Sequence, residues 1–324
     1  MVTSRNEETV KILITGGAGF VGRHLALHLK AKGHVVVVMD NLVRRGSEQN
    51  LPYFKKVGIS FVHGDVRNAE DFNILPIQFD IVLDTAAQAS VWNGYKNPTF
   101  DITNNYLGVV NTLEYVRKTG SKMIFWSTNR IYLNQQGERS IYGLSKYCAD
   151  VTCQEWAKAF NIPLIINRFS CLAGPWQYGY AEQGWLTWFV IAAVLELPIT
   201  IFGHKGDQSR DILFIPDVLT LIDKQIESLN YFKGEVFDVG GGKANIITLN
   251  KAISTIESLT KRKIQRNIGE ILSKGDLKHY TTDISKVSQV FAWVPQKKLK
   301  LGIYNIIEWV SSHKKELTNL YKEI

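Results

Sequence analysis

The 324-residue sequence has no apolar run of about 18 residues and contains only three cysteines. Because a membrane-spanning helix needs about 20 mostly apolar residues, we expect no membrane span. Cys148, Cys153 and Cys171 show no metal-ligand spacing, and their odd number argues against a disulfide framework. The first residues, MVTSRNEETVK, lack the apolar core of a signal peptide. We therefore expect a cytoplasmic protein that holds no metal.

Positive charge is not concentrated in any one stretch. The formal net charge is +8, from 38 Lys and Arg against 30 Asp and Glu. Only KRKIQR (261–266) and the tail SSHKKELTNLYKEI (311–324) are locally basic, and neither interleaves aromatic residues as a surface for single-stranded nucleic acid would. We expect solvated basic faces and no nucleic-acid partner, while the excess charge fits a phosphorylated small ligand.

Strand-length apolar runs alternate with helical periods through the first half of the chain. The expected strands cover 10–15, 34–40, 59–65, 79–87, 122–128 and 162–169, and the expected helices cover 19–32, a segment after Pro98, and 142 to about 160. Such alternation indicates a parallel sheet flanked by helices. The four consecutive valines at 35–38 fit a strand buried on both faces. We predict an α/β fold with a doubly wound Rossmann domain over 1–168. A smaller α/β substrate lobe over 169–324 follows, with some segments returning to the first domain.

The segment ILITGGAGFVG (12–22) joins a predicted strand to a predicted helix through closely spaced glycines. The glycines at 16, 19 and 22 allow a tight turn, a close approach of the backbone to a pyrophosphate, and close packing of helix on strand. Asp40 ends the next predicted strand, where a carboxylate accepts hydrogen bonds from the adenosine ribose and repels a 2′-phosphate. We predict a dinucleotide site that prefers NAD. The alternative is NADP, with its 2′-phosphate bound by Arg44 and Arg45.

Thr128, Tyr142 and Lys146 form a second pattern. Tyr142 and Lys146 are four residues apart on a predicted helix, so their side chains emerge on one face. A phenol with a pKa near ~10 is a poor base at neutral pH unless a nearby positive charge stabilises its ionised form. We expect Lys146 to supply that charge, and the alternative is that the pair lies on a solvated helix face.

With TGGAGFVG, MDN, HGDVRN, Thr128, Tyr142-x-x-x-Lys146 and SRDILFIPDV in this order, nearly the whole chain resembles the extended short-chain dehydrogenase/reductases, the nucleotide-sugar epimerase and dehydratase group. The resemblance implies that Tyr142 is the general base that takes a sugar hydroxyl proton as a hydride passes to NAD. It implies that Lys146 lowers the pKa of Tyr142 and holds the nicotinamide ribose. Thr128 would hydrogen-bond the reacting oxygen.

The resemblance also implies a set of cofactor-binding residues, with Asp65 and Val66 flanking the adenine and residues 86–88 lining the pyrophosphate and nicotinamide side. The full set is Gly16, Gly19, Phe20, Val21, Gly22, Asp40, Asn41, Arg44, Asp65, Val66, Ala86, Ala87, Gln88, Asn105, Tyr142, Lys146 and Ser170. Family helices around 98–119 and 142–160 usually pair in a four-helix interface, so we expect a homodimer or a higher homo-oligomer.

The residues after Thr128 point to one branch of the group. The 4,6-dehydratases of this family carry an Asp-Glu pair there, whereas this chain has Asn129 and Arg130, which favours epimerisation. The stretches STNRIY and RFSCLAGPWQYGYAEQGWLTWF resemble the CDP-tyvelose (CDP-paratose) 2-epimerases. By this resemblance the substrate, a nucleotide-diphosphate sugar, would be bound by Thr128, Asn129, Gln177, Gln183, Trp185, Trp188 and Arg210. The alternatives are that the tryptophans only fill a core and that Arg210 only pairs with Asp211 or another neighbour.

Some residues depart from that family pattern. Thr85 and Trp126 replace a common histidine and a small residue, and the loop over 133–141 is short. A diphosphate-binding arginine is missing upstream of TTDISKV, where Lys274 or Lys278 could act as a point charge. Other reactions therefore stay open: 4-epimerisation of a UDP-sugar, dehydration, decarboxylation or reduction. A non-catalytic NAD-binding regulator is the alternative of another class.

Overall fold

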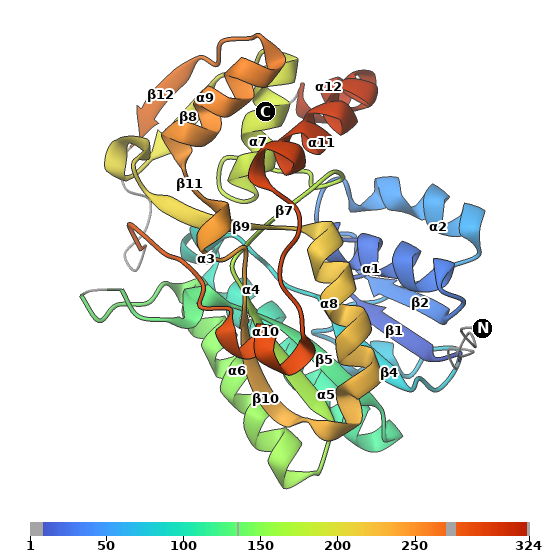
Figure 1. Ribbon diagram of the computed structural model, residues 1–324. Coiled ribbons are helices and arrows are strands. Elements are labelled where there is room, and N and C mark those ends of the chain that lie inside the picture. The colour runs from blue at the N-terminus through green and yellow to red at the C-terminus, as the bar shows by residue number, and fades with distance from the viewer. Residues whose placement is uncertain (1–8, 135, 270–276, 323–324) are drawn as a thin grey trace, which may run out of the picture.

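The computed structural model describes residues 9–134, 136–269 and 277–322. In that part of the chain, a central sheet of seven parallel strands has the order β10-β6-β5-β4-β1-β2-β3 (Figure 1). Its strands are β1 (Lys11–Thr15), β2 (Val35–Asp40), β3 (Ser60–His63), β4 (Ile81–Asp84), β5 (Lys122–Thr128), β6 (Leu164–Phe169) and β10 (Lys233–Val239). The strand order reverses beside β1, which is where a doubly wound sheet opens a crevice for a ligand.

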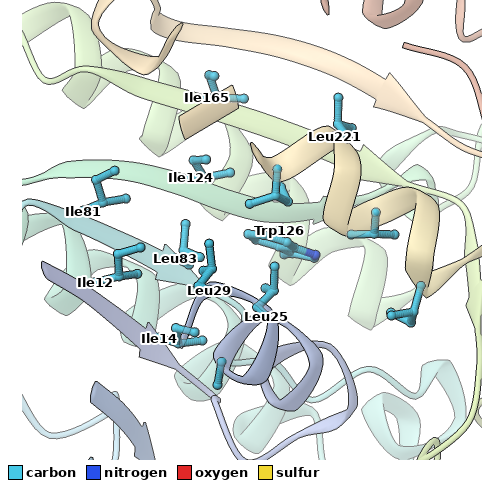
Figure 2. Packing of buried hydrophobic residues seen from close by; sticks show 14 of the residues in the cluster. Ile12, Ile14, Leu25, Leu29, Ile81, Leu83, Ile124, Trp126, Ile165 and Leu221 are labelled. Atoms are coloured by element: carbon cyan, nitrogen blue, oxygen red, sulfur yellow. The ribbon is translucent and has the colours of Figure 1, made fainter. Parts of the chain in front are cut away.

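Both faces of this sheet are buried, because successive side chains of a strand point to opposite sides. Ile12 and Ile14 face one hydrophobic cluster, and Leu13 faces another. The first cluster includes residues of α1 (Phe20–Ala31), α8 (Ile215–Ser228) and α10 (Ser285–Phe291), and the second includes residues of α5 (Gly108–Thr119) and α6 (Ile141–Ala159). Figure 2 shows the first cluster between the sheet and its helices. The predicted α/β fold is therefore confirmed.

The expected helix after Pro98 is built from three pieces. It begins as α4 (Pro98–Ile102), widens into a π-helical turn, η3 (Thr103–Leu107), and continues as α5. Such π-helical turns occur often at functional sites. This turn carries Asn105, which is fully buried and donates a hydrogen bond to the hydroxyl of Ser145 on α6.

The smaller lobe has its own core. One sheet contains β7 (Cys171–Ala173), β9 (Ser209–Phe214) and β11 (Ile246–Thr248), and a separate pair contains β8 (Ile199–Phe202) and β12 (Arg266–Gly269). The helices of this lobe are α7 (Trp185–Leu195), α9 (Leu249–Thr260), α11 (Leu299–Ser312) and α12 (Lys314–Tyr321). Helix α7 is apolar on nearly all sides, as expected for a helix that is covered by its neighbours. Here α9 and α11 pack against it. In Figure 1 this lobe lies above the carboxyl edge of the main sheet.

The chain passes between the two parts more than once. Strand β10 pairs with β6 in the main sheet, and α8 packs against α1, although both follow the first segments of the smaller lobe. The division into domains at residue 168 stays a prediction. Among the helices that the structure describes, none is long and apolar enough to cross a membrane.

Candidate active site

The glycine-rich turn after β1 leaves no room for side chains. Gly16 has a φ of +63°, and a Cβ placed on it would lie 2.6 Å from the Cα of Ala86. A Cβ on Gly22 would overlap the Cα of Gly17. Gly19 then precedes α1, so the first amides of this helix face the turn. Such a turn at a helix N-terminus suits a pyrophosphate.

A cavity of about 310 Å³ opens beside this turn, and we call it the cofactor cavity. Most of the predicted cofactor-binding residues line it: Gly16, Gly19, Phe20, Val21, Gly22, Asp40, Asn41, Arg44, Val66, Ala86, Ala87 and Gln88. Asp65 is not part of this lining. Its carboxylate instead accepts hydrogen bonds from the side chains of Arg67 and Asn41, and these bonds hold its pKa at about 2 against the effect of burial.

Asp40 both lines the cofactor cavity and supports the glycine turn. Its two carboxylate oxygens accept hydrogen bonds from the amide of Ala18, at 3.0 Å, and the amide of Leu42, at 2.8 Å. Burial raises the pKa of this carboxyl, and the backbone amides act in the opposite direction. Asp40 ends β2, so its carboxylate lies where a bound dinucleotide would place its adenosine ribose.

Arg44 joins the cofactor cavity to the smaller lobe. Its guanidinium donates to Oε1 of Gln183, at 2.6 Å, and to the carbonyl of Tyr178, at 3.2 Å. It also lies over the ring of Tyr180. Arg44 therefore links the two lobes as well as lining the cavity. Because its guanidinium is already engaged in these contacts, they argue against a site in which Arg44 only binds a 2′-phosphate.

Asn105 does not line the cofactor cavity but holds one of its walls. Its Oδ1 accepts from the amide of Gln88, at 2.8 Å, and its Nδ2 donates to the carbonyl of Gln88, at 3.0 Å. The Gln88 side chain donates to Oδ1 of Asp101, at 2.6 Å. Asn105 is therefore a support for the Gln88 backbone, contrary to the expectation that it contacts the cofactor directly. The reason is that the π-helical turn points it inward.

A second cavity, of about 370 Å³, adjoins the first, and we call it the substrate cavity. The two share lining residues, among them Phe20, Val21 and Ala87. The predicted site residues on its wall are Thr128, Asn129, Tyr142, Lys146, Ser170, Gln177, Gln183, Trp185 and Arg210. A ligand in this cavity would therefore lie against one in the cofactor cavity.

Trp188 does not line either cavity, and its role in substrate binding stays a prediction. It packs in the core of the smaller lobe, with its ring centroid 5.7 Å from that of Tyr321. Trp185, one turn earlier on α7, is on the substrate cavity wall. The two tryptophans differ because α7 is covered by other helices on the side of Trp188.

The polar residues of the smaller lobe are held by hydrogen bonds. Gln177 donates to the carbonyl of Leu172 and accepts from Thr187, and Ser170 donates to Asp211. Arg210 donates to the carbonyls of Ser209, at 2.7 Å, and Lys278, at 3.2 Å. The backbone of Lys278 thus orients Arg210. Lys274 lies outside the described residues, as does Gln135 of the short loop.

Thr128, Tyr142 and Lys146 come together on the wall of the substrate cavity. Thr128 ends β5, and its side chain hydrogen-bonds Tyr142 in the first turn of α6. Ser140 caps that turn by accepting from the amide of Gly143, at 3.0 Å. Tyr142 and Lys146 are only 7% and 2% exposed, so they do not lie on a solvated helix face.

Burial has the largest effect on the pKa of Tyr142, and the expected acidification of this phenol by Lys146 stays a prediction. Burial raises the pKa of Tyr142 to about 12, and Asp101 acts in the same direction. The Thr128 hydrogen bond and the charge of Arg130 act in the opposite direction. The ammonium of Lys146, one turn further along α6, lies 4.3 Å from the ring centroid of Phe125.

Burial lowers the pKa of Lys146 to about 8, and the negative charges of Asp84, Asp150 and Asp101 oppose this effect. Of these, Asp84 is buried and accepts a hydrogen bond from Thr15, and Asp150 is buried and pairs with Arg168. The charges of these carboxylates therefore favour the ionised form of Lys146.

Two residues of this site were not among the predicted ones. Asp101 is fully buried, and its charge acts on both Tyr142 and Lys146. Arg130 lines the substrate cavity next to Thr128. The available signals were a carboxylate in the predicted helix after Pro98 and a cation two residues after Thr128.

Comparisons with known proteins bear on this arrangement. Residues 12–240 match the model of the NAD-dependent epimerase/dehydratase family. The chain belongs to the NAD-dependent epimerase/dehydratase family. It is an enzyme of this family, and its cofactor is NAD. The narrow turn at Gly16 and Gly22, followed by the start of α1, fits NAD, because the backbone there can approach a pyrophosphate that side chains would keep away.

Several relatives within this family match nearly the whole chain. A CDP-paratose 2-epimerase from Salmonella typhi is 30% identical, with 94% of this chain and 100% of that protein covered. A putative UDP-glucose 4-epimerase from Methanocaldococcus jannaschii is 29% identical, with 93% and 99% covered.

Solved structures of the family have the same fold. A UDP-glucose 4-epimerase from Thermotoga maritima with UDP-glucose superposes with a TM-score of 0.84 at 26% identity, covering 94% of this chain and 99% of that one. A UDP-glucuronic acid 4-epimerase from Bacillus cereus in complex with UDP-glucuronic acid and NAD gives a TM-score of 0.82 at 26% identity, with 93% and 99% covered.

Proposed function

We propose that this enzyme is a nucleotide-sugar epimerase that inverts C2 of a CDP-sugar. The observation that carries the proposal is the hydrogen-bonded pair of Thr128 and Tyr142 on the wall of the substrate cavity, which shares lining residues with the cofactor cavity. A sugar hydroxyl in this cavity would meet a phenol and a second hydroxyl close to the cofactor side of the site. Such a meeting point suits the reversible oxidation of an alcohol.

The reaction would balance within the site. NAD, when bound, supplies a hydride acceptor that later returns the same hydride. Tyr142 takes the proton of the sugar hydroxyl while the C–H bond breaks and a carbonyl forms, and it returns the proton when the carbonyl is reduced on its other face. Thr128 orients the oxygen, and Arg210 anchors the diphosphate while the sugar turns.

The charges of the substrate cavity favour epimerisation over elimination of water. Asn129 and Arg130 follow Thr128, where a dehydratase of the family would carry two carboxylates. Within the cavity lining as described, the carboxylate side chain is that of Glu182, which is exposed. Because elimination needs an additional acid and base, this lining supports a reaction that returns its hydride to the sugar.

The choice of C2 and of a CDP-sugar is supported by the smaller lobe. Gln183 and Trp185, from the motif shared with CDP-tyvelose 2-epimerases, line the substrate cavity. The CDP-paratose 2-epimerase relative adds support at 30% identity. Inversion at C4 of a UDP-sugar would use the same Thr128, Tyr142 and Lys146.

The test is to incubate purified protein that carries NAD with CDP-tyvelose, CDP-paratose, UDP-glucose and UDP-glucuronic acid, each in a separate reaction, and to follow sugar stereochemistry by proton NMR. We expect interconversion of the two CDP-sugars without net formation of NADH. Turnover only at C4 of a UDP-sugar would contradict the C2 assignment, and stoichiometric NADH would contradict epimerisation. The Tyr142→Phe variant is the control for enzyme-dependent turnover.

We also propose that the enzyme is a homodimer that pairs through α4, η3, α5 and α6. Ile102, Leu107, Leu144 and Tyr147 on these elements are large, apolar and exposed. Light scattering after gel filtration should give twice the chain mass for the wild type and the chain mass for Leu107→Glu. Val290→Glu, which changes an equally exposed apolar residue on α10, should stay dimeric. A monomeric wild type would contradict the proposal.

A further inference from the structure

Two glutamines, Gln177 and Gln183, line both the cofactor cavity and the substrate cavity. The amide of Gln177 is engaged at both ends. Its Nε2 donates to the carbonyl of Leu172, at 3.1 Å, and its Oε1 accepts from the hydroxyl of Thr187, at 2.6 Å. Gln177 is also buried, so its amide serves to hold the cavity wall together.

The amide of Gln183 is engaged at one end only. Its Oε1 accepts from Nη2 of Arg44, at 2.6 Å, whereas its Nε2 makes no hydrogen bond with another residue that the structure describes. Because a guanidinium can only donate, the amide atom that faces Arg44 is the oxygen, and the NH2 group lies on the other side of the amide carbon. Gln183 is half-buried on the wall that the two cavities share, so this NH2 group can donate to a ligand.

Arg44 is itself held against the smaller lobe. Its Nη2 also donates to the carbonyl of Tyr178, at 3.2 Å, and its guanidinium lies 5.2 Å from the ring centroid of Tyr180. Gly46, in the same loop, has a φ of +94°, and a Cβ placed on it would lie 2.7 Å from the ring of Tyr178. The loop therefore lies tightly against this lobe, which fixes the direction from which Arg44 meets Gln183.

The backbone of Gln183 is fixed as well. Gln183 and Tyr180 exchange two backbone hydrogen bonds, of 2.8 and 3.1 Å, which close a tight turn. Gly184 follows with a φ of +76°, and a Cβ placed on it would lie 3.1 Å from the amide carbon of Gln177. The freedom left to Gln183 is rotation of its side chain, and the hydrogen bond from Arg44 removes it.

We propose that Arg44 is a positioning residue for the nucleotide sugar. By holding Oε1 of Gln183, it turns the NH2 group of Gln183 toward the substrate cavity, where this group donates to an oxygen of the nucleotide sugar. Without Arg44 the amide can present either its oxygen or its NH2 group, so the donor is no longer fixed. This inference rests on the proposed function only in placing a nucleotide sugar in the substrate cavity.

The test compares the affinity of one nucleotide sugar for a set of proteins, all saturated with NAD. CDP-paratose and UDP-glucose are each titrated into the wild type by calorimetry, and the tighter ligand is then used for every variant. The variants are Arg44→Met, Gln183→Leu, the double variant and Gln183→Glu. Because the measurement itself selects the ligand, a wrong assignment of the sugar or of the reacting carbon leaves the comparison unchanged.

We expect Arg44→Met and Gln183→Leu each to weaken binding about two- to tenfold, the loss of one neutral hydrogen bond. The double variant should bind no more weakly than Gln183→Leu, because Arg44 acts through Gln183. Gln183→Glu keeps an acceptor for Arg44 but has no NH2 group, so it should bind at least as weakly as Gln183→Leu. If Arg44→Met does not hold NAD, Arg44→Lys, which lacks the planar fork, replaces it in the single and the double variant.

The matched control is Arg262→Met. The guanidinium of Arg262 also donates to one carbonyl, that of Val194, and to one side-chain oxygen, that of Glu196, but it lies outside the lining of both cavities. This variant should bind the nucleotide sugar like the wild type, and a loss equal to that of Arg44→Met would overturn the specific role of Arg44.

Three other results would overturn the proposal. In the double variant, a loss equal to the product of the two single losses would mean that Arg44 acts separately from Gln183. Wild-type affinity in Gln183→Glu would mean that the NH2 group is not used. A weaker NAD affinity in Gln183→Leu, with unchanged affinity for the nucleotide sugar, would mean that the amide serves the cofactor.

Discussion

Replacing Lys146 with methionine should make the protein's stability less dependent on alkaline pH. In the folded state, burial lowers the pKa of Lys146 from 10.5 to about 8. At about 1.4 kcal/mol per pH unit, this difference corresponds to a cost of about 3 kcal/mol for keeping the ammonium buried at neutral pH. Methionine keeps the length of the side chain and its packing on Phe125 but carries no charge.

The sign follows from proton binding. Between pH 8 and 10.5 the unfolded chain holds the lysine proton more tightly than the folded protein does, so the free energy of unfolding rises with pH over this window. Above pH 10.5 the lysine is neutral in both states and the cost is gone. The wild-type free energy of unfolding minus that of Lys146→Met should therefore rise by about 3 kcal/mol between pH 8 and 10.5.

Urea unfolding of both proteins, freed of NAD, at several pH values measures this difference directly. Taking the difference removes the titration of groups that do not interact with Lys146. A difference that is flat across the window would refute the conclusion that Lys146 is a buried cation with a lowered pKa. A difference that falls with pH would do so as well.

Four further variants test the other parts of the site. Tyr142→Phe should lower kcat by about 10²–10⁴-fold while NAD stays bound, and more than about a tenth of wild-type kcat would contradict its role as base. Asp40→Ala should destabilise the fold by about 1–3 kcal/mol in thermal unfolding, because the buried amide of Ala18 loses its acceptor, and should reduce the preference for NAD over NADP in binding titrations. Trp188→Ala should cost about 3–5 kcal/mol in urea unfolding with little effect on KM, whereas Trp185→Ala should raise KM about tenfold.

The results for the Asp40 and Trp188 variants test separate claims. An Asp40 variant with unchanged cofactor preference would show that its carboxylate serves only the glycine turn. If the Trp188 variant raised KM as much as the Trp185 variant without losing stability, the placement of Trp188 in the core would be contradicted.

The sheet could be predicted from the sequence because buried parallel strands leave an unmistakable apolar pattern. The four valines at 35–38 became β2, and the glycine turn stands between β1 and α1 as expected. The π-helical turn at 103–107 could not be predicted, since the helical period continues across it. That turn decides that Asn105 supports the cofactor cavity instead of lining it.

The candidate catalytic residues could be found from spacing, but their electrostatics could not. Tyr142 and Lys146 are neighbours in the sequence, whereas Asp84, Asp101 and Asp150 reach Lys146 only through folding. Sequence spacing says nothing of burial, which here has the largest effect on both pKa values.

The tryptophans of the motif QGWLTWF show a related limit. Trp185 and Trp188 are one turn apart on a helix that is apolar on nearly all sides. The hydrophobic pattern of such a helix does not show which side meets a cavity. Only the packing of α11 and α12 places Trp188 in the core.

The central claim, that the site reversibly oxidises a sugar carbon and returns the hydride to its other face, can be tested with one labelled substrate. A CDP-sugar that carries deuterium at C2 is incubated with the protein and NAD in ordinary water, and the product is examined by deuterium and proton NMR. We predict inversion at C2 with deuterium retained at that carbon in both epimers. Loss of the label to solvent with inversion at C2, or inversion at a different carbon, would contradict the account.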